Sequence, residues 1–235
     1  MLCAPSPLLR AAATATDSMS DPHLELAAVL APDDSASFEE VYAIYSRALP
    51  LREQKSKLDL IRLLARSDYR VLVVRRSAIV IGFSVVFAPA DEPFCLLEYM
   101  AVDAVTRNAG VGTRLFRCVL EDVQAHRGTV PLLLEVDSPR ELGADHASRC
   151  RRQDFYRRLG CLIVDQLAYA LPLAGTGPPP LMDLMLHRAD QSRPISKADL
   201  RAWLAVVFER VYGTSSRDPR IERMMRPVPD PVRLV

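Results

Sequence analysis

The stretch LLEYMAVDAVTRNAGVGTRLFRCVL, from Leu96 to Leu120, decides the fold that we expect for this chain. It opens with an apolar run of the length of a central strand, Leu96 to Val102, which only Glu98 interrupts. A glycine turn follows, and apolar residues then recur every four positions from Val111, as on one face of a helix. Unpaired backbone N–H groups at a helix start bind anions, and glycines let the backbone approach them closely. The stretch therefore predicts a phosphate-binding junction between a buried strand and a helix.

The glycine turn excludes two common nucleotide-binding motifs. From Arg107 to Gly112 it reads RNAGVG, or Arg-x-x-Gly-x-Gly. A dinucleotide-binding turn would have a third glycine three residues after Gly112, where Leu115 stands. A Walker A loop would continue with lysine and then serine or threonine, but Thr113 and Arg114 follow. A plain strand-to-helix turn is the alternative to an anion site.

Composition predicts a soluble globular protein with one substantial core, because the 235 residues are 49% hydrophobic and 25% charged. The formal net charge of +1 gives no general attraction to nucleic acid or to an anionic membrane, and we expect neither as a partner. No apolar run approaches the ~20 residues of a membrane span. Five cysteines without a CxxC pair indicate reduced thiols, so we expect a cytoplasmic protein. No His/Cys/carboxylate spacing indicates a metal site, and we expect no metal.

We expect three parts along the chain. Residues 1–22 are rich in Ala, Ser, Thr and Pro, which predicts a disordered extension, and Met19 is an alternative start to Met1. Residues 23–188 form the main domain. Residues 189–235 form a helical extension with an irregular tail.

Strands and helices alternate through the main domain. We expect strands at 23–31, 69–74, 78–87, 96–102, 130–136, 161–171 and 181–186. We expect helices from a Ser37–Glu40 capping box to Leu49, from Ser56 to about Ser67, from Val111 to about Gly128 and from Arg149 to Leu159. In the second helix, Leu60, Ile61, Leu63 and Leu64 are expected to point inward. The pattern predicts an α/β protein with a mixed sheet.

The C-terminal extension predicts one more helix. Ser196 and Asp199 form a capping box, and the helix ends before Gly213. Its apolar face includes Trp203 and Phe208. We expect this face to pack on the sheet rather than to form an exposed interface. The tail from residue 214 is expected to be irregular.

The order of elements and two motifs resemble GNAT-type N-acetyltransferases. The matching residues are Met100, Ala101 and Val102 at the end of the central strand, Arg107, Gly110 and Gly112 in the family's Q/R-x-x-G-x-G/A turn, and Phe155, Tyr156, Leu159 and Gly160 at the end of the later short helix. The resemblance extends from about residue 23 to 188. It implies a GNAT fold with a mixed central sheet of about six to seven strands flanked by helices, to which this chain adds a C-terminal helix.

The resemblance also implies the co-substrate, acetyl-coenzyme A. Its pyrophosphate would lie over backbone amides of the glycine turn, and its pantetheine arm would pair with the end of the central strand. The residues implied in binding are Met100, Ala101, Val102, Arg107, Asn108, Ala109, Gly110, Val111, Gly112 and Thr113. A main-chain N–H near Ala101 or Val102 would stabilise the negative charge that develops on the thioester oxygen.

Three side chains are candidates for acid–base catalysis. An acceptor ammonium with a pKa of ~10 must lose a proton before it attacks, which requires a carboxylate or a water that it orders. Glu98 is the first candidate base and Glu135, on the expected neighbouring strand, is the second. Strand alternation predicts that Glu98 shares a face with Met100. Tyr156 matches the family position that protonates the departing thiolate.

One position departs from the family pattern. Arg149 stands where many members have an asparagine, seven residues before the tyrosine, so that contact is not carried over. Arg149 belongs to an arginine-rich helix for which a solvated face is the ordinary interpretation, although an arginine there would also reach a phosphate.

The sequence therefore predicts an N-acetyltransferase that moves an acetyl group from acetyl-CoA to a primary amine by direct attack in a ternary complex. The acceptor is a small molecule or a protein amine, and residues 49–56 and 138–148 are expected to surround it. A homodimer is compatible with this expectation. The alternative is a non-catalytic acetyl-CoA-binding sensor or interaction module.

Overall fold

A computed structural model describes residues 24–106, 109–140, 143–172 and 180–235 of the chain. The expected disordered extension, together with Arg107 and Asn108, lies outside these described residues. In chain order the elements are β1 (Leu24–Val29), α1 (Ser35–Ala48), η1 (Leu51–Glu53), α2 (Lys57–Leu64), β2 (Tyr69–Arg76), β3 (Ile79–Phe87), β4 (Cys95–Val102), η2 (Ala104–Thr106), α3 (Val111–Arg127), β5 (Leu132–Asp137), α4 (His146–Arg158), β6 (Cys161–Ile163), β7 (Tyr169–Ala170), β8 (Leu181–His187), α5 (Lys197–Arg210) and α6 (Pro219–Met225).

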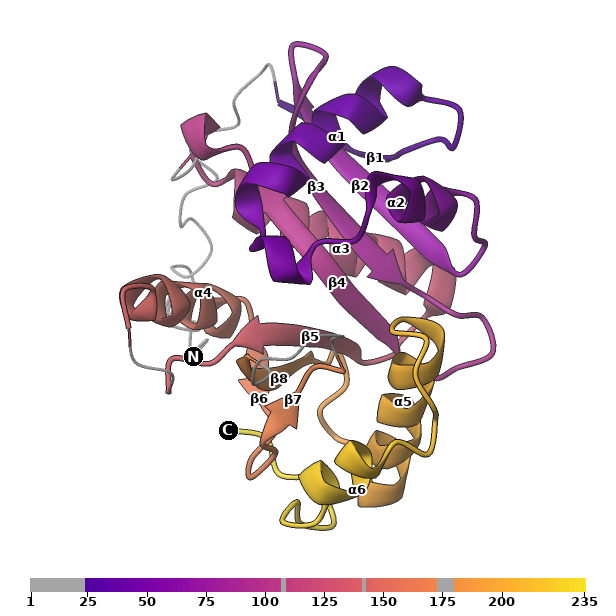
Figure 1. The fold of residues 1–235 in the computed structure, drawn as a ribbon, viewed down its shortest axis with the longest axis vertical. Coiled ribbons are helices and arrows are strands. Elements are labelled where there is room, and N and C mark those ends of the chain that lie inside the picture. Colours follow the sequence, from indigo (N-terminus) through magenta and orange to yellow (C-terminus); the bar gives the residue numbers. More distant parts are fainter. Residues whose placement is uncertain (1–23, 107–108, 141–142, 173–179) are drawn as a thin grey trace, which may run out of the picture.

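The strands form one mixed sheet in the order β1-β2-β3-β4-β5-β8-β6, with the short β7 also paired to β8 (Figure 1). Neighbouring strands are antiparallel except β4 and β5, which are parallel. The parallel pair is joined by α3, which follows from the rule that parallel neighbours need a crossover. This mixed sheet with flanking helices confirms the fold class predicted from the sequence.

The predicted hairpin between β2 and β3 is confirmed, and its turn is tight. Ser77 and Ala78 connect the strands with φ values of +50° and +69°. Positive φ at both central residues matches the twist of two-residue hairpins, although neither residue is a glycine. On its other edge β3 pairs with β4, the strand that carries Glu98.

The helices cover the two faces of the sheet. Side chains of α1, α2, α5 and α6 belong to the larger apolar cluster on one face, and side chains of α3 and α4 belong to the cluster on the other. Strand alternation separates the two clusters along β4, since Leu96 belongs to the first and Leu97 to the second.

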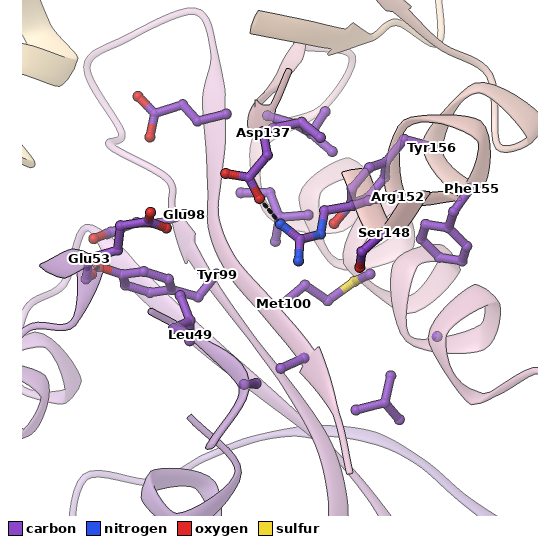
Figure 2. A pocket seen from close by; sticks show the side chains of 18 of the residues that line it. Leu49, Glu53, Glu98, Tyr99, Met100, Asp137, Ser148, Arg152, Phe155 and Tyr156 are labelled. Carbon is purple, nitrogen blue, oxygen red and sulfur yellow. Dashed lines mark hydrogen bonds and ion pairs between the residues drawn. The ribbon is translucent and has the colours of Figure 1, made fainter. Parts of the chain in front are cut away.

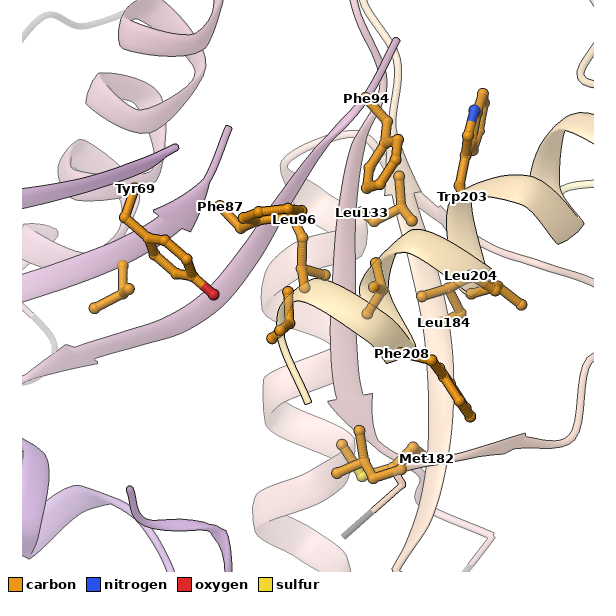
Figure 3. Close-up of a cluster of buried hydrophobic side chains, with 14 of the residues drawn as sticks. Tyr69, Phe87, Phe94, Leu96, Leu133, Met182, Leu184, Trp203, Leu204 and Phe208 are labelled. Atoms are coloured by element: carbon orange, nitrogen blue, oxygen red, sulfur yellow. The ribbon is translucent and has the colours of Figure 1, made fainter. Parts of the chain in front are cut away.

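The C-terminal helix α5 is part of the core, as the sequence predicts. Leu204 and Phe208 are 0% exposed, and the Trp203 ring lies 5.8 Å from that of Phe94. Figure 3 shows these side chains beside Leu96, Leu133 and Leu184, which come from three strands. The extension therefore closes the same face of the sheet that α1 and α2 cover further along.

The predicted capping box at the start of α1 is wrong. The helix starts two residues earlier than Ser37, and the Asp34 carboxylate accepts a hydrogen bond from the Ser37 amide at 3.0 Å. Glu40 instead accepts from the amide of Val80 at 3.0 Å, which ties α1 to the start of β3. Asp34 caps the helix in place of Ser37, because an aspartate carboxylate is among the strongest N-cap groups. In α2, Ile61 points outward and is 44% exposed, contrary to expectation.

Two C-terminal predictions are also wrong. The expected strand 161–171 is split into β6 and β7, because the chain turns at Gln166 with φ +61°. The expected irregular tail contains α6, which begins with Asp218 as N-cap and Pro219 in its first turn. This pair is a helix-start signal that fits proline's fixed φ and missing N–H.

None of the described helices is long and apolar enough to cross a bilayer.

Replacing Leu204 by alanine should lower the free energy of unfolding by about 2–5 kcal/mol, because it leaves a cavity in the core. Leu58→Ala is the matched control, since Leu58 is 55% exposed and its truncation should change stability by about 0.5 kcal/mol or less. Urea unfolding of the two variants measures the difference. Equal stability of both variants would show that α5 is not part of the core.

Candidate active site

The sheet opens between its two parallel strands. β4 and β5 pair at Cys95–Leu132, Leu96–Leu133 and Leu97–Leu134, and no further pair follows among the described residues of these strands. β4 continues for five residues and β5 for three beyond the last pair. A cavity of about 940 Å³ occupies the gap and is lined by both strand ends. A cavity of this size admits a ligand of the size of a large cofactor.

A β-bulge at Glu98 starts this opening. Val86 pairs with Leu97 and Val85 with Tyr99, so Glu98 is an extra residue with no partner on β3. The bulge breaks the alternation of the strand and directs Glu98 to the face of α1 and α5. The prediction that Glu98 shares a face with Met100 is therefore wrong, because alternation holds only where strands are regular.

Glu98 is held by a cation and a phenol. Its side chain is 2% exposed, and Oε1 lies 3.0 Å from Nζ of Lys55. The Tyr69 hydroxyl donates to Oε2 at 3.0 Å. Figure 2 shows Glu98 and Tyr99 on one side of the cavity and Tyr156 on the other. A buried carboxylate needs such partners, because desolvation otherwise disfavours its charge.

Glu135 lies where β5 leaves β4 and also lines the cavity. Its two carboxylate oxygens each accept a hydrogen bond from a phenol, Oε1 from Tyr169 and Oε2 from Tyr212. Burial raises the pKa of Glu135 to about 7, although the two phenols act in the opposite direction. Nearby Glu98 raises this pKa and Lys55 lowers it. Glu135 therefore titrates close to neutral pH, as a general base does.

Tyr156 is provided by α4 and packs from the opposite face. It is 8% exposed, and its ring makes edge contacts with Phe116 and Phe155 at centroid distances of 5.5 and 5.0 Å. Burial raises the pKa of Tyr156 well above the ordinary value for a phenol. The hydroxyl therefore keeps its proton at neutral pH and is able to donate it.

The start of α3 forms a second part of the cavity wall. Gly110 is the N-cap with φ +75°, a conformation that favours glycine, and it has no side chain with which to cap the helix. The N–H groups of the first turn are therefore available to an anion. Gly112 lines the cavity, and a Cβ there would lie 3.5 Å from Val102 and 3.6 Å from Phe155.

An ion pair connects α4 with the end of β5. Arg152 binds Asp137, and Figure 2 shows the pair at the cavity wall beside Tyr156. Arg151 and Arg158 of the same helix also line the cavity. These arginines are the part of the expected arginine-rich helix that lines the cavity.

A sequence model of the acetyltransferase (GNAT) family matches residues 38–161, which is more than half of the chain. The chain belongs to this family. The protein is therefore an acetyltransferase by family, as its sequence motifs predict. A search of curated protein sequences gave no significant match.

Solved structures share the GNAT fold. A GNAT-assigned protein from Bacteroides thetaiotaomicron superposes with a TM-score of 0.64 at 20% identity, over 80% of this chain and 99% of its own. An aminoglycoside 6'-N-acetyltransferase complexed with coenzyme A gives a TM-score of 0.57 at 17% identity, over 72% and 99%. The ribosomal-protein-S18-alanine N-acetyltransferase from Escherichia coli superposes with a TM-score of 0.51 at 17% identity, over 72% of this chain and 99% of its own. At these identities the likeness concerns the fold.

The GNAT chain brings most of its predicted site residues to one cavity. Those lining it are Glu98, Met100, Ala101, Val102, Gly110, Gly112, Thr113, Glu135 and Tyr156. Val111 is buried at the start of α3, and Ala109 precedes the helix. From the expected acceptor segments, Leu49, Pro50, Glu53, Gln54, Lys55 and Ser148 line the cavity.

Sequence reasoning missed the four residues that hold the two glutamates. Lys55 and Tyr69 bind Glu98, and Tyr169 and Tyr212 bind Glu135, but no motif contains them. Two signals pointed to Lys55, which lies in the expected acceptor segment 49–56 and is one of three lysines in the sequence. The tyrosines meet the glutamates only through the tertiary fold.

The titration of Glu135 makes a prediction for stability. Between pH ~4.5 and ~7 the folded protein holds a proton that the unfolded chain has lost, so the free energy of unfolding should fall as the pH rises. The loss should be on the order of 3 kcal/mol, since one pKa unit corresponds to about 1.4 kcal/mol. Glu135→Gln should lose this component. Urea unfolding of both proteins from pH 4.5 to 8 measures it, and parallel curves would contradict the assignment.

Proposed function

We propose that this GNAT protein transfers an acetyl group from acetyl-CoA to a primary amine by direct attack in a ternary complex. The observation that carries the proposal is the continuity of one cavity, which runs from the uncapped start of α3 along the unpaired end of β4 to Glu135. A phosphate-bearing thioester and an amine require these environments, an anion site at one end and a base at the other.

The chain's own groups fit acetyl-CoA. The amides of Gly110 to Thr113 would bind the pyrophosphate, aided by the positive end of the α3 dipole and the arginines of α4. Residues 100–102 have no partner on β5 and would hydrogen-bond the amides of the pantetheine arm, as an added strand does. Arg107 and Asn108, which the family motif also implies, stay predictions.

Of the two candidate bases, Glu135 is the better suited. Glu98 already balances the ammonium of Lys55 and accepts from Tyr69. Glu135 has no such cation in direct contact among the described residues, and its pKa of about 7 lets it take a proton near neutral pH. We therefore assign Glu135 as the base that deprotonates the acceptor ammonium, directly or through a water. Glu98 would hold Lys55 and add negative charge that attracts a cationic acceptor.

The remaining steps follow from charge. The amine nitrogen attacks the thioester carbonyl, and a main-chain N–H at Ala101 or Val102 stabilises the oxyanion. When the carbon–sulfur bond breaks, the thiolate leaves with a parent pKa of ~8.5. Tyr156 donates its proton to the sulfur, which gives the thiol. The attacking nitrogen loses its second proton to solvent as the amide forms, and the Tyr156 phenolate takes a proton back from solvent, so that the phenol is restored.

The acceptor is assigned no further than a primary amine. Fold relatives act on an aminoglycoside and on an alanine of a ribosomal protein, so the same fold serves unrelated acceptors. In this chain we place the acceptor end at the segment between α1 and α2, which lines the same cavity as Glu135. Charges of both signs line it, which fits an ammonium group on an otherwise polar molecule.

Glu135→Gln should abolish the acid limb of the pH profile of kcat/KM, which we expect near pH 7 in the parent, and lower kcat by about 10²–10⁴-fold. Glu98→Gln is the matched control and should keep an acid limb, moved to lower pH because the Glu98 charge no longer raises the pKa of Glu135. Steady-state acetyl transfer to a panel of amines, measured by thiol release, provides the profiles. A normal limb in Glu135→Gln together with a lost limb in Glu98→Gln would reverse the assignment.

Tyr156→Phe should lower kcat by about 10²-fold and leave the Kd of acetyl-CoA nearly unchanged, since the phenol acts on the departing thiolate. Tyr42→Phe, which removes a hydroxyl from α1, serves as the control. Unchanged kcat in Tyr156→Phe would remove the phenol from the mechanism. Coenzyme A binding without transfer or hydrolysis by the parent protein would favour the sensor alternative.

Gly112→Ala tests the anion site. Its Cβ would make ordinary contacts with Val102 and Phe155, so the free protein should keep its stability. It would, however, narrow the cavity beside the α3 amides, and the Kd of coenzyme A should rise by about tenfold, the equivalent of one or two lost hydrogen bonds. Isothermal titration with coenzyme A measures the change. An unchanged Kd would place the pyrophosphate elsewhere.

A further inference from the structure

The two phenols that bind Glu135 come from outside the segment that matches the GNAT family model. The match ends at residue 161, whereas Tyr169 lies in β7 and Tyr212 follows α5. The base candidate itself lies within the match. The site of this protein is therefore completed by a part of the chain that the family pattern does not describe.

The C-terminal segment is anchored directly at the cavity. Nζ of Lys55 donates to the carbonyl oxygen of Val211 at 3.4 Å and lies 5.7 Å from the ring centre of Tyr212. On the other side, the amide of Tyr212 bonds to the Val207 oxygen at 3.3 Å, and its ring makes an edge contact with Phe208, which is 0% exposed. These contacts fix the position from which Tyr212 reaches Glu135.

Packing alone does not require a phenol at either position. A phenylalanine would fill the same space, and a buried hydroxyl is costly unless it is bonded. Tyr169 is 1% exposed, and its hydroxyl has Glu135 as its partner. Each phenol takes one oxygen of the carboxylate, so together they fix its rotation about the last side-chain bond.

We propose that Tyr212, together with Tyr169, is a positioning residue for the base, and that the C-terminal extension is thereby an integral part of the catalytic centre. The phenols hold the Glu135 carboxylate toward the cavity, where it meets the acceptor ammonium. This inference rests on the proposed function of Glu135 and extends it to residues that the family motif does not contain.

The charged and titratable groups around Glu135 determine the direction of the effect. Glu98 faces it from β4, Lys55 from the segment before α2, Tyr169 from β7, and Tyr212 from the end of α5. The two phenols donate to the ionised form and lower the pKa of Glu135. Removing one hydroxyl should therefore raise this pKa and shift the acid limb of activity to higher pH.

Tyr212→Phe is the test, because it keeps the ring and removes the hydroxyl. We expect the acid limb of kcat/KM to move up by about one pH unit, the equivalent of one hydrogen bond to a charged group. Relative to the parent, kcat/KM should then fall by about tenfold at pH 6 and by less than twofold at pH 9. Tyr169→Phe should shift the limb in the same direction. Tyr42→Phe removes a hydroxyl from a half-buried tyrosine of α1 and should leave the limb unmoved.

A second readout needs no activity. The pH dependence of unfolding, compared between each tyrosine variant and the same variant carrying Glu135→Gln, reports the pKa of Glu135 in the folded protein. In the parent protein the pH-dependent loss of stability that Glu135 causes should end at about pH 7. In Tyr212→Phe we expect it to end at about pH 8. If Tyr212→Phe does not fold, Tyr169→Phe supplies both readouts.

The role of Tyr212 would be overturned if Tyr212→Phe left both the acid limb of kcat/KM and the unfolding titration of Glu135 unchanged. An equal loss of kcat/KM at pH 6 and pH 9 in this variant would also overturn it. The proposed function fails differently, by the absence of acetyl transfer from the parent protein. In that case the unfolding titration still decides whether the phenols control Glu135. The two failures are therefore distinguishable.

Discussion

The short pairing between β4 and β5 is the constraint on which the site depends. Three residue pairs hold the two halves of the sheet together, and the bulge at Glu98 ends the pairing. Apolar packing makes this arrangement stable, because α5 covers the junction near Leu96 and Leu133 while α3 bridges β2, β3 and β4 from the other face. The gap is thus a consequence of strand geometry supported by a continuous core, and its edges carry backbone groups that a ligand is able to bind.

Two glutamates at this gap have different electrostatic surroundings. Lys55 compensates Glu98, so the charge of that carboxylate is balanced within the protein. Glu135 is bonded by phenols, which donate hydrogen bonds without adding positive charge. Two uncompensated carboxylates would each make the other harder to ionise, and the lysine limits this effect. The arrangement leaves one carboxylate to exchange a proton near neutral pH and one to support it.

Local patterns made much of the fold predictable, since periodicity and glycine positions act within a few residues. The strand, turn and helix around Gly110 and the β2–β3 hairpin were predictable for this reason. The orientation of Glu98 was not, because a bulge depends on how the partner strand pairs. The Tyr212–Glu135 contact joins residues 77 positions apart, and no local rule anticipates such a distance. The helix α6 was missed although Asp218 and Pro219 are a start signal that local reasoning could have used.

Hydrogen exchange with and without acetyl-CoA tests most directly whether the splayed strands hold the co-substrate. We expect saturating acetyl-CoA to slow amide exchange at residues 98–102 of β4 and 110–114 at the start of α3, because their unpaired N–H groups would bind it. Four residues of β2 that pair with both β1 and β3, Leu72, Val73, Arg75 and Arg76, should exchange at unchanged rates. Unchanged exchange at residues 98–102 under saturating acetyl-CoA would contradict the central claim that this gap is the acetyl-transfer site.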